Sequence, residues 1–179
     1  LLKQLSGGKT SWVVRYRDSA AVAAFAQSEE CEGALVGPIT PDHVIRTKAT
    51  PCLIRGLTES AFYPDGLSLE DVAETPEGDE ALRAFIKTAL DEYVANYHAY
   101  FESNNARVGG IKMELDPLPR VFLLEHFGLF TADKNVKACA ISADIYEHTV
   151  PTIFSSMASS SANAFQPMTR EELFDVEYW

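Results

Sequence analysis

Cysteine is scarce in this sequence of 179 residues, and no two cysteines form a close pair. The three present are Cys31, Cys52 and Cys139. An odd number of widely spaced cysteines argues against a disulfide framework and favours a reducing compartment, so we expect a cytoplasmic protein. No apolar run approaches the roughly 20 residues needed to cross a bilayer, and the sequence therefore predicts no membrane-spanning segment.

Basic side chains are also few. The chain has 15 Lys and Arg against 26 Asp and Glu, which gives a formal net charge of −11. Nucleic acids and anionic membrane surfaces are recognised by clustered cations. The charge balance therefore predicts no nucleic-acid partner and no membrane partner.

Sequence motifs of common catalytic sites are missing. None of the four histidines stands in an HxH or HExxH pattern; they are His43, His98, His126 and His148. The chain has no GxSxG, GxGxxG or Tyr-x-x-x-Lys motif, and SGGKT (residues 6–10) lacks the first glycine of a phosphate-binding loop. The sequence alone therefore predicts no catalytic residue, no cofactor-binding residue and no metal site.

The overall composition is that of an ordinary globular domain. Hydrophobic residues make up 46% and charged residues 23% of the chain, and its length suits one domain with a substantial core. We therefore expect residues 1–179 to form a single domain. The chain opens on a helix end with a glycine turn (LLKQLSGGKT) and stops on an aromatic cluster (FDVEYW), which is typical of a segment from a longer polypeptide.

Hydrophobic periodicity predicts helices that alternate with short strands. Strands are expected at residues 11–17 and 51–54, and residues 121–124 and 129–131 are either adjacent strands or one bent strand. Helices are expected at residues 20–29, 41–45, 79–103 and 135–148, with a kink or new turn at Pro151, and a capping box begins another at Thr169. Loops are expected at residues 55–78 and 155–161. This order predicts an α/β fold, a layered sheet with helices on its faces.

The segment GPITPDHVIRTK (residues 37–48) has the densest group of functional side chains. Its polar residues can clamp a phosphate or carboxylate. Alternatively, the segment is a capped turn in which Asp42 and Arg46 pair. Arg120 either reaches an anion or pairs with a neighbouring acid. The candidate ligand-binding residues are Thr40, Asp42, His43, Arg46, Lys48, Arg120 and His126.

Three segments together resemble a known family: residues 37–48, residues 116–149 (DPLPRVFLLEHFGLFTADKNVKACAISADIYEHT) and residues 173–179 (LFDVEYW). They are similar to the middle region of bifunctional class II aldolase/short-chain dehydrogenase proteins, of the bacterial rhamnulose-phosphate aldolase/alcohol dehydrogenase type. In that family an N-terminal aldolase domain binds zinc and a C-terminal dehydrogenase domain binds a nicotinamide cofactor. The resemblance implies that NAD(P) and zinc belong to the parent oxidoreductase of carbohydrate metabolism, and that this segment holds no cofactor.

The resemblance also implies a lost metal site. Residues 121–149 are similar to the closing unit of a class II aldolase domain, in which a zinc-binding histidine directly precedes a glycine. Here Phe127 precedes Gly128, and His126 stands one position early. Because neighbouring side chains of a strand point to opposite faces, His126 should not reach the ligand position. We therefore expect a degenerate aldolase-like unit without metal.

Three hypotheses for function follow. The favoured one is a non-catalytic connector or oligomerisation domain, which contacts the neighbouring aldolase and dehydrogenase domains of its chain and forms a homo-oligomer. The alternative is a binding domain for a sugar phosphate or aldehyde passed between the parent's active sites, held by residues 40–48 with Arg120 or His126. A third is retained activity, which would need a zinc site built from His43, His126 and acids.

Overall fold

The computed structural model describes residues 1–8, 11–56, 75–125, 127–158 and 167–179. Its strands form one four-stranded sheet in the order β1-β4-β3-β2. The strands are β1 (Val13–Arg17), β2 (Cys52–Ile54), β3 (Val121–Leu124) and β4 (Gly128–Asp133). β4 runs antiparallel to both β1 and β3, whereas β2 and β3 are parallel. The expected α/β class is confirmed.

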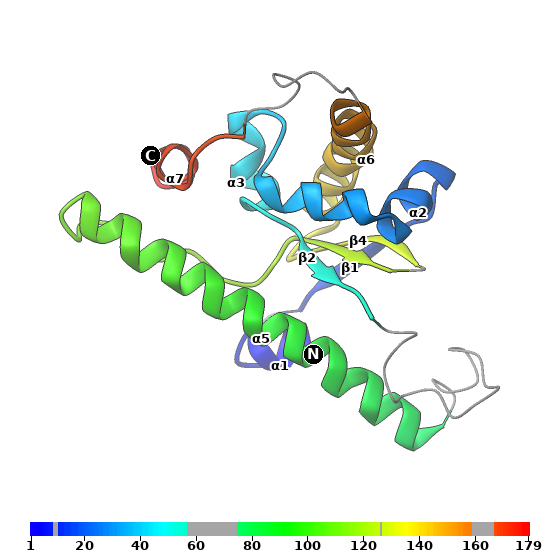
Figure 1. The fold of residues 1–179 in the computed structure, drawn as a ribbon. Helices are drawn as coiled ribbons and strands as arrows, with labels where there is room; N and C mark the ends of the chain where they lie inside the picture. Colours follow the sequence, from blue (N-terminus) through cyan, green and yellow to red (C-terminus); the bar gives the residue numbers. More distant parts are fainter. Residues whose placement is uncertain (9–10, 57–74, 126, 159–166) are drawn as a thin grey trace.

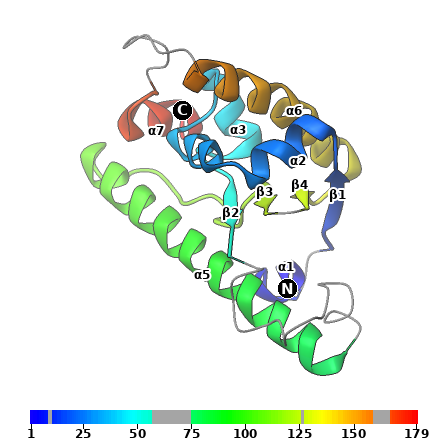
Figure 2. The same ribbon diagram turned by 45° about the vertical axis from the view of Figure 1, so that its right-hand side comes forward.

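Helices cover both faces of this sheet (Figures 1 and 2). On one face lie α2 (Ala20–Gln27), the 3-10 helices η1 (Glu29–Val36) and η2 (Pro41–His43), α3 (Val44–Thr47) and α6 (Val136–Ala158). On the other lie α1 (Leu2–Leu5) and α5 (Pro76–Arg107). α7 (Arg170–Glu177) packs beside α3 and α5. No helix within the described residues is both long and apolar enough to cross a bilayer.

The central strand β3 explains why two layers of helices form. Its side chains alternate between the faces, and three of its four residues are fully apolar and buried. Val121 and Leu123 join a core cluster with Phe25 of α2, while Phe122 joins another with Leu90 of α5. A strand that is apolar on both faces requires a cover on each side.

Helix α5 is longer than its periodicity predicts. It begins at Pro76 because the Thr75 hydroxyl accepts a hydrogen bond from Gly78 N at 3.1 Å, which caps the first turn. At its other end, Asn104 donates to the Tyr100 carbonyl at 3.0 Å and remains helical. The predicted loop at residues 76–78 and the predicted last helical residue 103 are therefore wrong. The rest of that loop, residues 57–74, lies outside the described residues.

Strands β3 and β4 form a hairpin, which decides between the two alternatives left open by the sequence. The turn is closed by a hydrogen bond from Phe127 N to Leu124 O at 3.1 Å. Gly128 starts β4 at φ +111, and a Cβ at this position would lie 3.0 Å from the backbone oxygen of Arg17. The hairpin therefore passes the end of β1 at a distance that leaves no room for a side chain.

Helix α6 continues through Pro151 to Ala158, so the predicted helix end at residue 148 and the predicted loop at residues 155–158 are wrong. Val150 and Ile153 are buried in the core on either side of the proline. Burial of this apolar face stabilises the helix beyond the residue that disfavours it locally. Residues 159–161 of the predicted loop lie outside the described residues. α3 likewise extends to Thr47, two residues beyond the helix predicted at residues 41–45.

Candidate functional site

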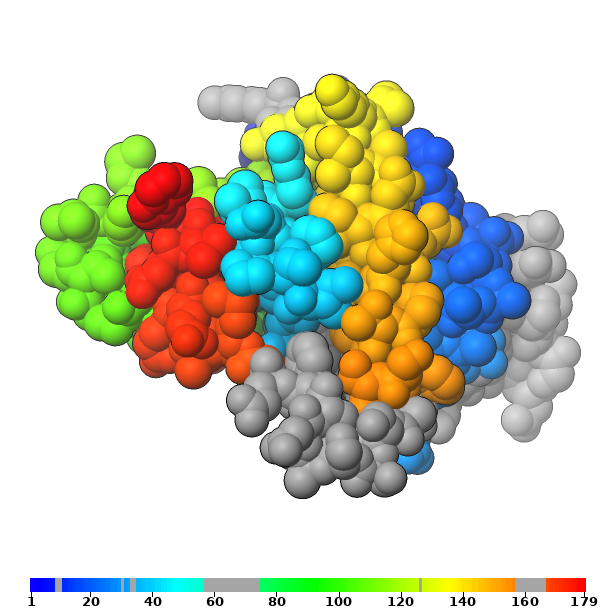
Figure 3. All heavy atoms as spheres, turned by 90° about the horizontal axis from the view of Figure 1, so that it is seen from above, coloured from blue at the N-terminus to red at the C-terminus, as the bar shows by residue number. Residues whose placement is uncertain are grey.

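The last helix, α7, is capped at its start and is held to α5 by an ion pair. The expected capping box is present: Thr169 Oγ1 accepts from Glu172 N at 3.2 Å, and Glu172 Oε2 accepts from Thr169 N at 2.8 Å. Arg107 at the end of α5 forms an ion pair with Asp175. Figure 3 shows α7 in red beside the chain around residues 40–48 in cyan. Two segments that resemble family motifs therefore lie in contact.

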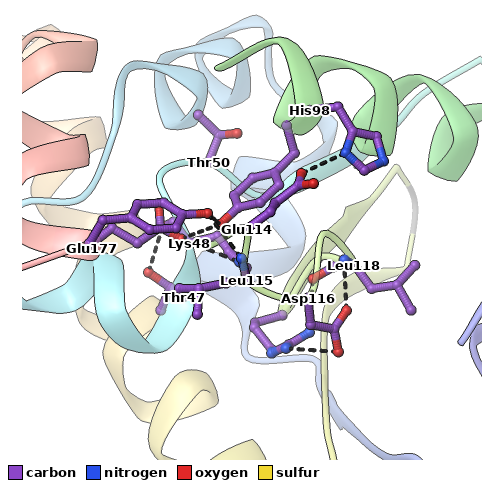
Figure 4. A network of polar contacts seen from close by, with 12 residues as sticks. Thr47, Lys48, Thr50, His98, Glu114, Leu115, Asp116, Leu118 and Glu177 are labelled. Atoms are coloured by element: carbon purple, nitrogen blue, oxygen red, sulfur yellow. Dashed lines mark hydrogen bonds and ion pairs between the residues drawn. The ribbon is translucent and has the colours of Figure 1, made fainter. Parts of the chain in front are cut away.

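Lys48 joins these two segments. It follows α3 with φ +67, a left-handed conformation that is uncommon for a residue with a side chain. Its Nζ lies 3.3 Å from Glu177 Oε1, and the two side chains are only 7% and 1% exposed. The same Nζ lies 3.9 Å from the centre of the Tyr97 ring, a cation–π contact. Figure 4 shows Lys48 and Glu177 pointing toward each other.

A chain of hydroxyl groups completes the environment of Glu177. Tyr97 donates to Glu177 Oε1 at 2.8 Å, and the Tyr97 and Tyr178 oxygens are 2.6 Å apart. Tyr178 in turn accepts from the backbone N–H of Leu115 at 3.3 Å. Because the Tyr97 hydroxyl donates its hydrogen bond to the carboxylate, the Tyr178 hydroxyl must be the donor in the bond between the two tyrosines. The network thus runs from the carboxylate to the chain that follows α5.

Burial dominates the electrostatics of this site. Burial lowers the pKa of Lys48 from 10.5 to about 8, although the Glu177 carboxylate acts in the opposite direction. Burial, and then the charge of Glu177, raise the pKa of Tyr97 and of Tyr100 above the ordinary range. The charge of Glu177 acts on the pKa of Tyr100 through space, because the Tyr100 hydroxyl forms no hydrogen bond with a described residue. Both hydroxyls are therefore protonated at neutral pH, and Tyr97 is the one that donates to the Glu177 carboxylate.

The structure separates the candidate residues of the 40–48 segment. The side chains of Thr40, Asp42 and Arg46 are exposed, and His43 is half-buried with an Nδ1 atom that has no hydrogen-bond partner among the described residues. Lys48 points into the interior, away from the solvent that surrounds Arg46. The ion pair between Asp42 and Arg46, one of the two alternatives for this segment, does not form. Neither side chain has an ion-pair partner among the residues described.

Arg120 pairs with neighbouring acids, as one of its two expected roles required. Its guanidinium lies 3.4 Å from Asp116 and 3.7 Å from Asp133, and it donates to the Leu118 carbonyl at 2.8 Å. The group also stacks 5.1 Å from the ring centre of Trp12. These contacts hold the entry to β3 against the end of β4.

The position that precedes Gly128 serves packing. Phe127 belongs to the apolar cluster between the sheet and α5, in the company of Phe130 and Leu124. His126 lies outside the described residues. In the part of the chain that the structure describes, no three His, Cys, Asp or Glu side chains converge as a metal ligand set would.

A cavity of about 550 Å³ lies next to the buried pair, between α5, α7 and the approach to β2. Tyr97 and Tyr100 form part of its wall, together with Glu92, Asn96 and Arg170. The three- and four-residue spacing of Tyr93, Tyr97 and Tyr100 predicts one face of a helix turned to the core, and Tyr97 and Tyr100 are buried. Glu177 was missed. The signal for it was an acid directly between two hydrophobic residues, Val176 and Tyr178, in the segment FDVEYW.

Comparison with known proteins supports the aldolase part of the resemblance. A family model described as "Aldolase class II, second domain" matches residues 1–179, the whole chain. No curated protein and no solved structure matches the chain. The four-stranded sheet between helices agrees with the fold expected from that resemblance. This chain belongs to the family of class II aldolase second domains.

Proposed function

We propose that this domain is a non-catalytic structural module, which connects or assembles the catalytic domains of a class II aldolase-type protein. The Lys48–Glu177 ion pair carries the proposal. Lys48 is a candidate anion-binding cation, yet its ammonium group pairs within the domain with the carboxylate of Glu177 in α7. The segments around residues 37–48 and 173–179, which both resemble family motifs, therefore stabilise each other. Their charged residues Lys48 and Glu177 are explained by this structural role.

A connector must keep its two ends in a fixed relation. α1 packs beneath the sheet through Leu1, Leu2 and Leu5, in the same cluster as Leu90 of α5. α7 is held against the other half of α5 by Phe174, which lies in an aromatic cluster with Tyr100. Both terminal helices are thus attached to one long helix, and α5 sets the distance between them (Figure 1). By the resemblance, the neighbours are an aldolase domain and a short-chain dehydrogenase domain.

The alternative is a binding domain for a sugar phosphate or aldehyde. One observation favours it: Arg46 is an exposed cation without an ion-pair partner among the described residues. An anion clamp usually needs a second cation or several N–H donors. Lys48 does not supply one, because it is buried on the far side of α3 against Glu177.

A thermal-unfolding titration separates these functions. A ligand at 100 times its Kd adds about 2.7 kcal/mol of stability, which raises the Tm of a domain of this size by roughly 5–10 °C. If the domain is a structural module, neither inorganic phosphate nor a sugar phosphate should shift the Tm of the wild type or of Arg46→Ala. A shift in the wild type that disappears in Arg46→Ala would overturn the proposal in favour of the binding domain.

A further inference from the structure

The cavity of about 550 Å³ follows one face of α5. Its α5 wall extends from Ala89 to Tyr100, a distance of about 16 Å at the rise per residue of an α-helix. The facing wall consists of residues 49–53, which lead into β2, together with Val36 and with Leu173 of α7. Most of the lining residues are apolar, and the volume lies in the range of about 300–1,000 Å³ that is typical of small-molecule sites. The cavity therefore has the size and the lining of a site for an elongated apolar ligand.

The two ends of this cavity carry opposite charges. At the α7 end, the Arg170 guanidinium lies 5.6 Å from the centre of the Tyr100 ring, a cation–π contact. Toward the β2 end lies Glu92, and burial, followed by the charge of Glu92, raises the pKa of the Cys52 thiol to about 12. Glu92 and Tyr100 are about 12 Å apart along the helix axis. Neither Arg170 nor Glu92 has an ion-pair partner among the described residues, so a cation is available at one end only.

We propose that this cavity binds a linear aliphatic carboxylate, with its carboxylate on Arg170 and its alkyl chain between the apolar walls. A guanidinium donates two parallel hydrogen bonds to a carboxylate, so one arginine is sufficient for a group with a single negative charge. Asn96, which lines the cavity one helical turn before Tyr100, has amide N–H groups that can add a donor. Burial of the alkyl chain supplies the remaining affinity, because its apolar surface leaves water.

The charge of Glu92 fixes the direction of the ligand. Its carboxylate repels an anion at the β2 end of the cavity, so the anionic end of the ligand lies at α7. Inorganic phosphate and sugar phosphates have no alkyl chain to fill the cavity, and Arg170 alone lacks the second cation of a phosphate clamp. The site therefore adds a ligand to the structural module without turning it into the sugar-phosphate domain of the alternative.

Isothermal titration calorimetry of the 179-residue chain at neutral pH tests the site with three ligands of equal chain length. These are octanoate, octanol and octanedioate, each at up to millimolar concentration. Octanoate should bind about tenfold more tightly than octanol, which has no charge for Arg170. It should also bind several-fold more tightly than octanedioate, whose second carboxylate extends toward Glu92.

Two substitutions assign these differences to their residues. Arg170→Gln should weaken the binding of octanoate about tenfold and leave that of octanol unchanged. Glu92→Gln should bring octanedioate close to octanoate, because the repulsion is removed. Arg46→Gln, at an exposed cation outside the cavity, is the matched control and should change none of the three affinities. The substituted side chains are exposed, and circular dichroism confirms that each variant retains the fold.

Three results would each overturn the inference. They are a wild-type chain that binds no octanoate at millimolar concentration, octanol that binds as tightly as octanoate, and octanoate binding that Arg170→Gln leaves unchanged. The phosphate titration above tests the proposed function separately, because it depends on Arg46, which does not line the cavity.

Discussion

Lys48 and Glu177 form a buried ion pair between residues that are 129 positions apart in the sequence, with Nζ and Oε1 separated by 3.3 Å. Burial of two charges costs free energy that their attraction recovers only when the geometry is good and further hydrogen bonds are made. Tyr97 supplies such a hydrogen bond at 2.8 Å. The arrangement makes each partner dependent on the other, and it fixes α7 at one position on the domain.

The stability of the domain should rise with pH through Lys48. Its pKa is lowered to about 8 in the folded chain, against 10.5 in the unfolded chain. Between these values the unfolded state binds more protons at this site, so stability increases by up to about 1.4 kcal/mol per pH unit, and below pH 8 the contribution is constant. Urea unfolding at pH 7.5–9.5 measures the slope.

Lys48→Met should lack this increase. Other groups, among them Cys52 with its raised pKa, titrate in both proteins and cancel in the difference between them. Equal slopes for wild type and variant over this range would contradict the prediction.

Gly128→Ala should destabilise the domain by about 2 kcal/mol or more, because the residue has φ +111 and an added Cβ meets the Arg17 backbone at 3.0 Å. Gly109 is the matched control, since it has φ +88 but no atom within 4 Å of an added Cβ. Gly109→Ala should cost only the conformational part, about 1 kcal/mol. Denaturant unfolding compares the two. Similar losses for both variants would show that the contact at Gly128 has no weight.

Thr169→Ala should loosen the start of α7. The change removes the hydroxyl that accepts from Glu172 N at 3.2 Å, and the loss of such a cap costs about 1 kcal/mol. Thr169→Ser keeps the acceptor and should stay close to wild type. Hydrogen exchange of the α7 amides, with denaturant unfolding, detects the difference. If the serine and alanine variants exchange alike, the capping box does not hold this helix.

Local patterns were sufficient for most of the elements. The capping box at Thr169 and the strand near residues 51–54 depend on neighbouring residues alone, and the structure confirms both. The start of α5 was predicted wrongly because its cap signal, Thr75 and Pro76, stands within an acidic stretch rich in proline and glycine, a composition typical of loops. The end of α6 was predicted too early because the burial of Val150 and Ile153 outweighs the local effect of Pro151.

The site itself required long-range information. Periodicity placed Tyr97 on the buried face of α5, which is correct, but no pattern in the sequence indicates that α7 would lie against that face. Arg46 and Lys48 looked equivalent as cations of one segment. The left-handed turn at Lys48, φ +67, directs the chain so that one side chain is buried and the other remains in solvent.

A double-mutant cycle on Lys48 and Glu177 tests the central claim most directly. Lys48→Met and Glu177→Leu each leave a buried charge without its partner, and each should lower the free energy of unfolding at pH 7 by about 3–5 kcal/mol. The double variant replaces the pair by apolar side chains and should lose at least about 2 kcal/mol less than the sum of the single losses. Losses that simply add would contradict the account, because the two segments would then not be held together by this pair.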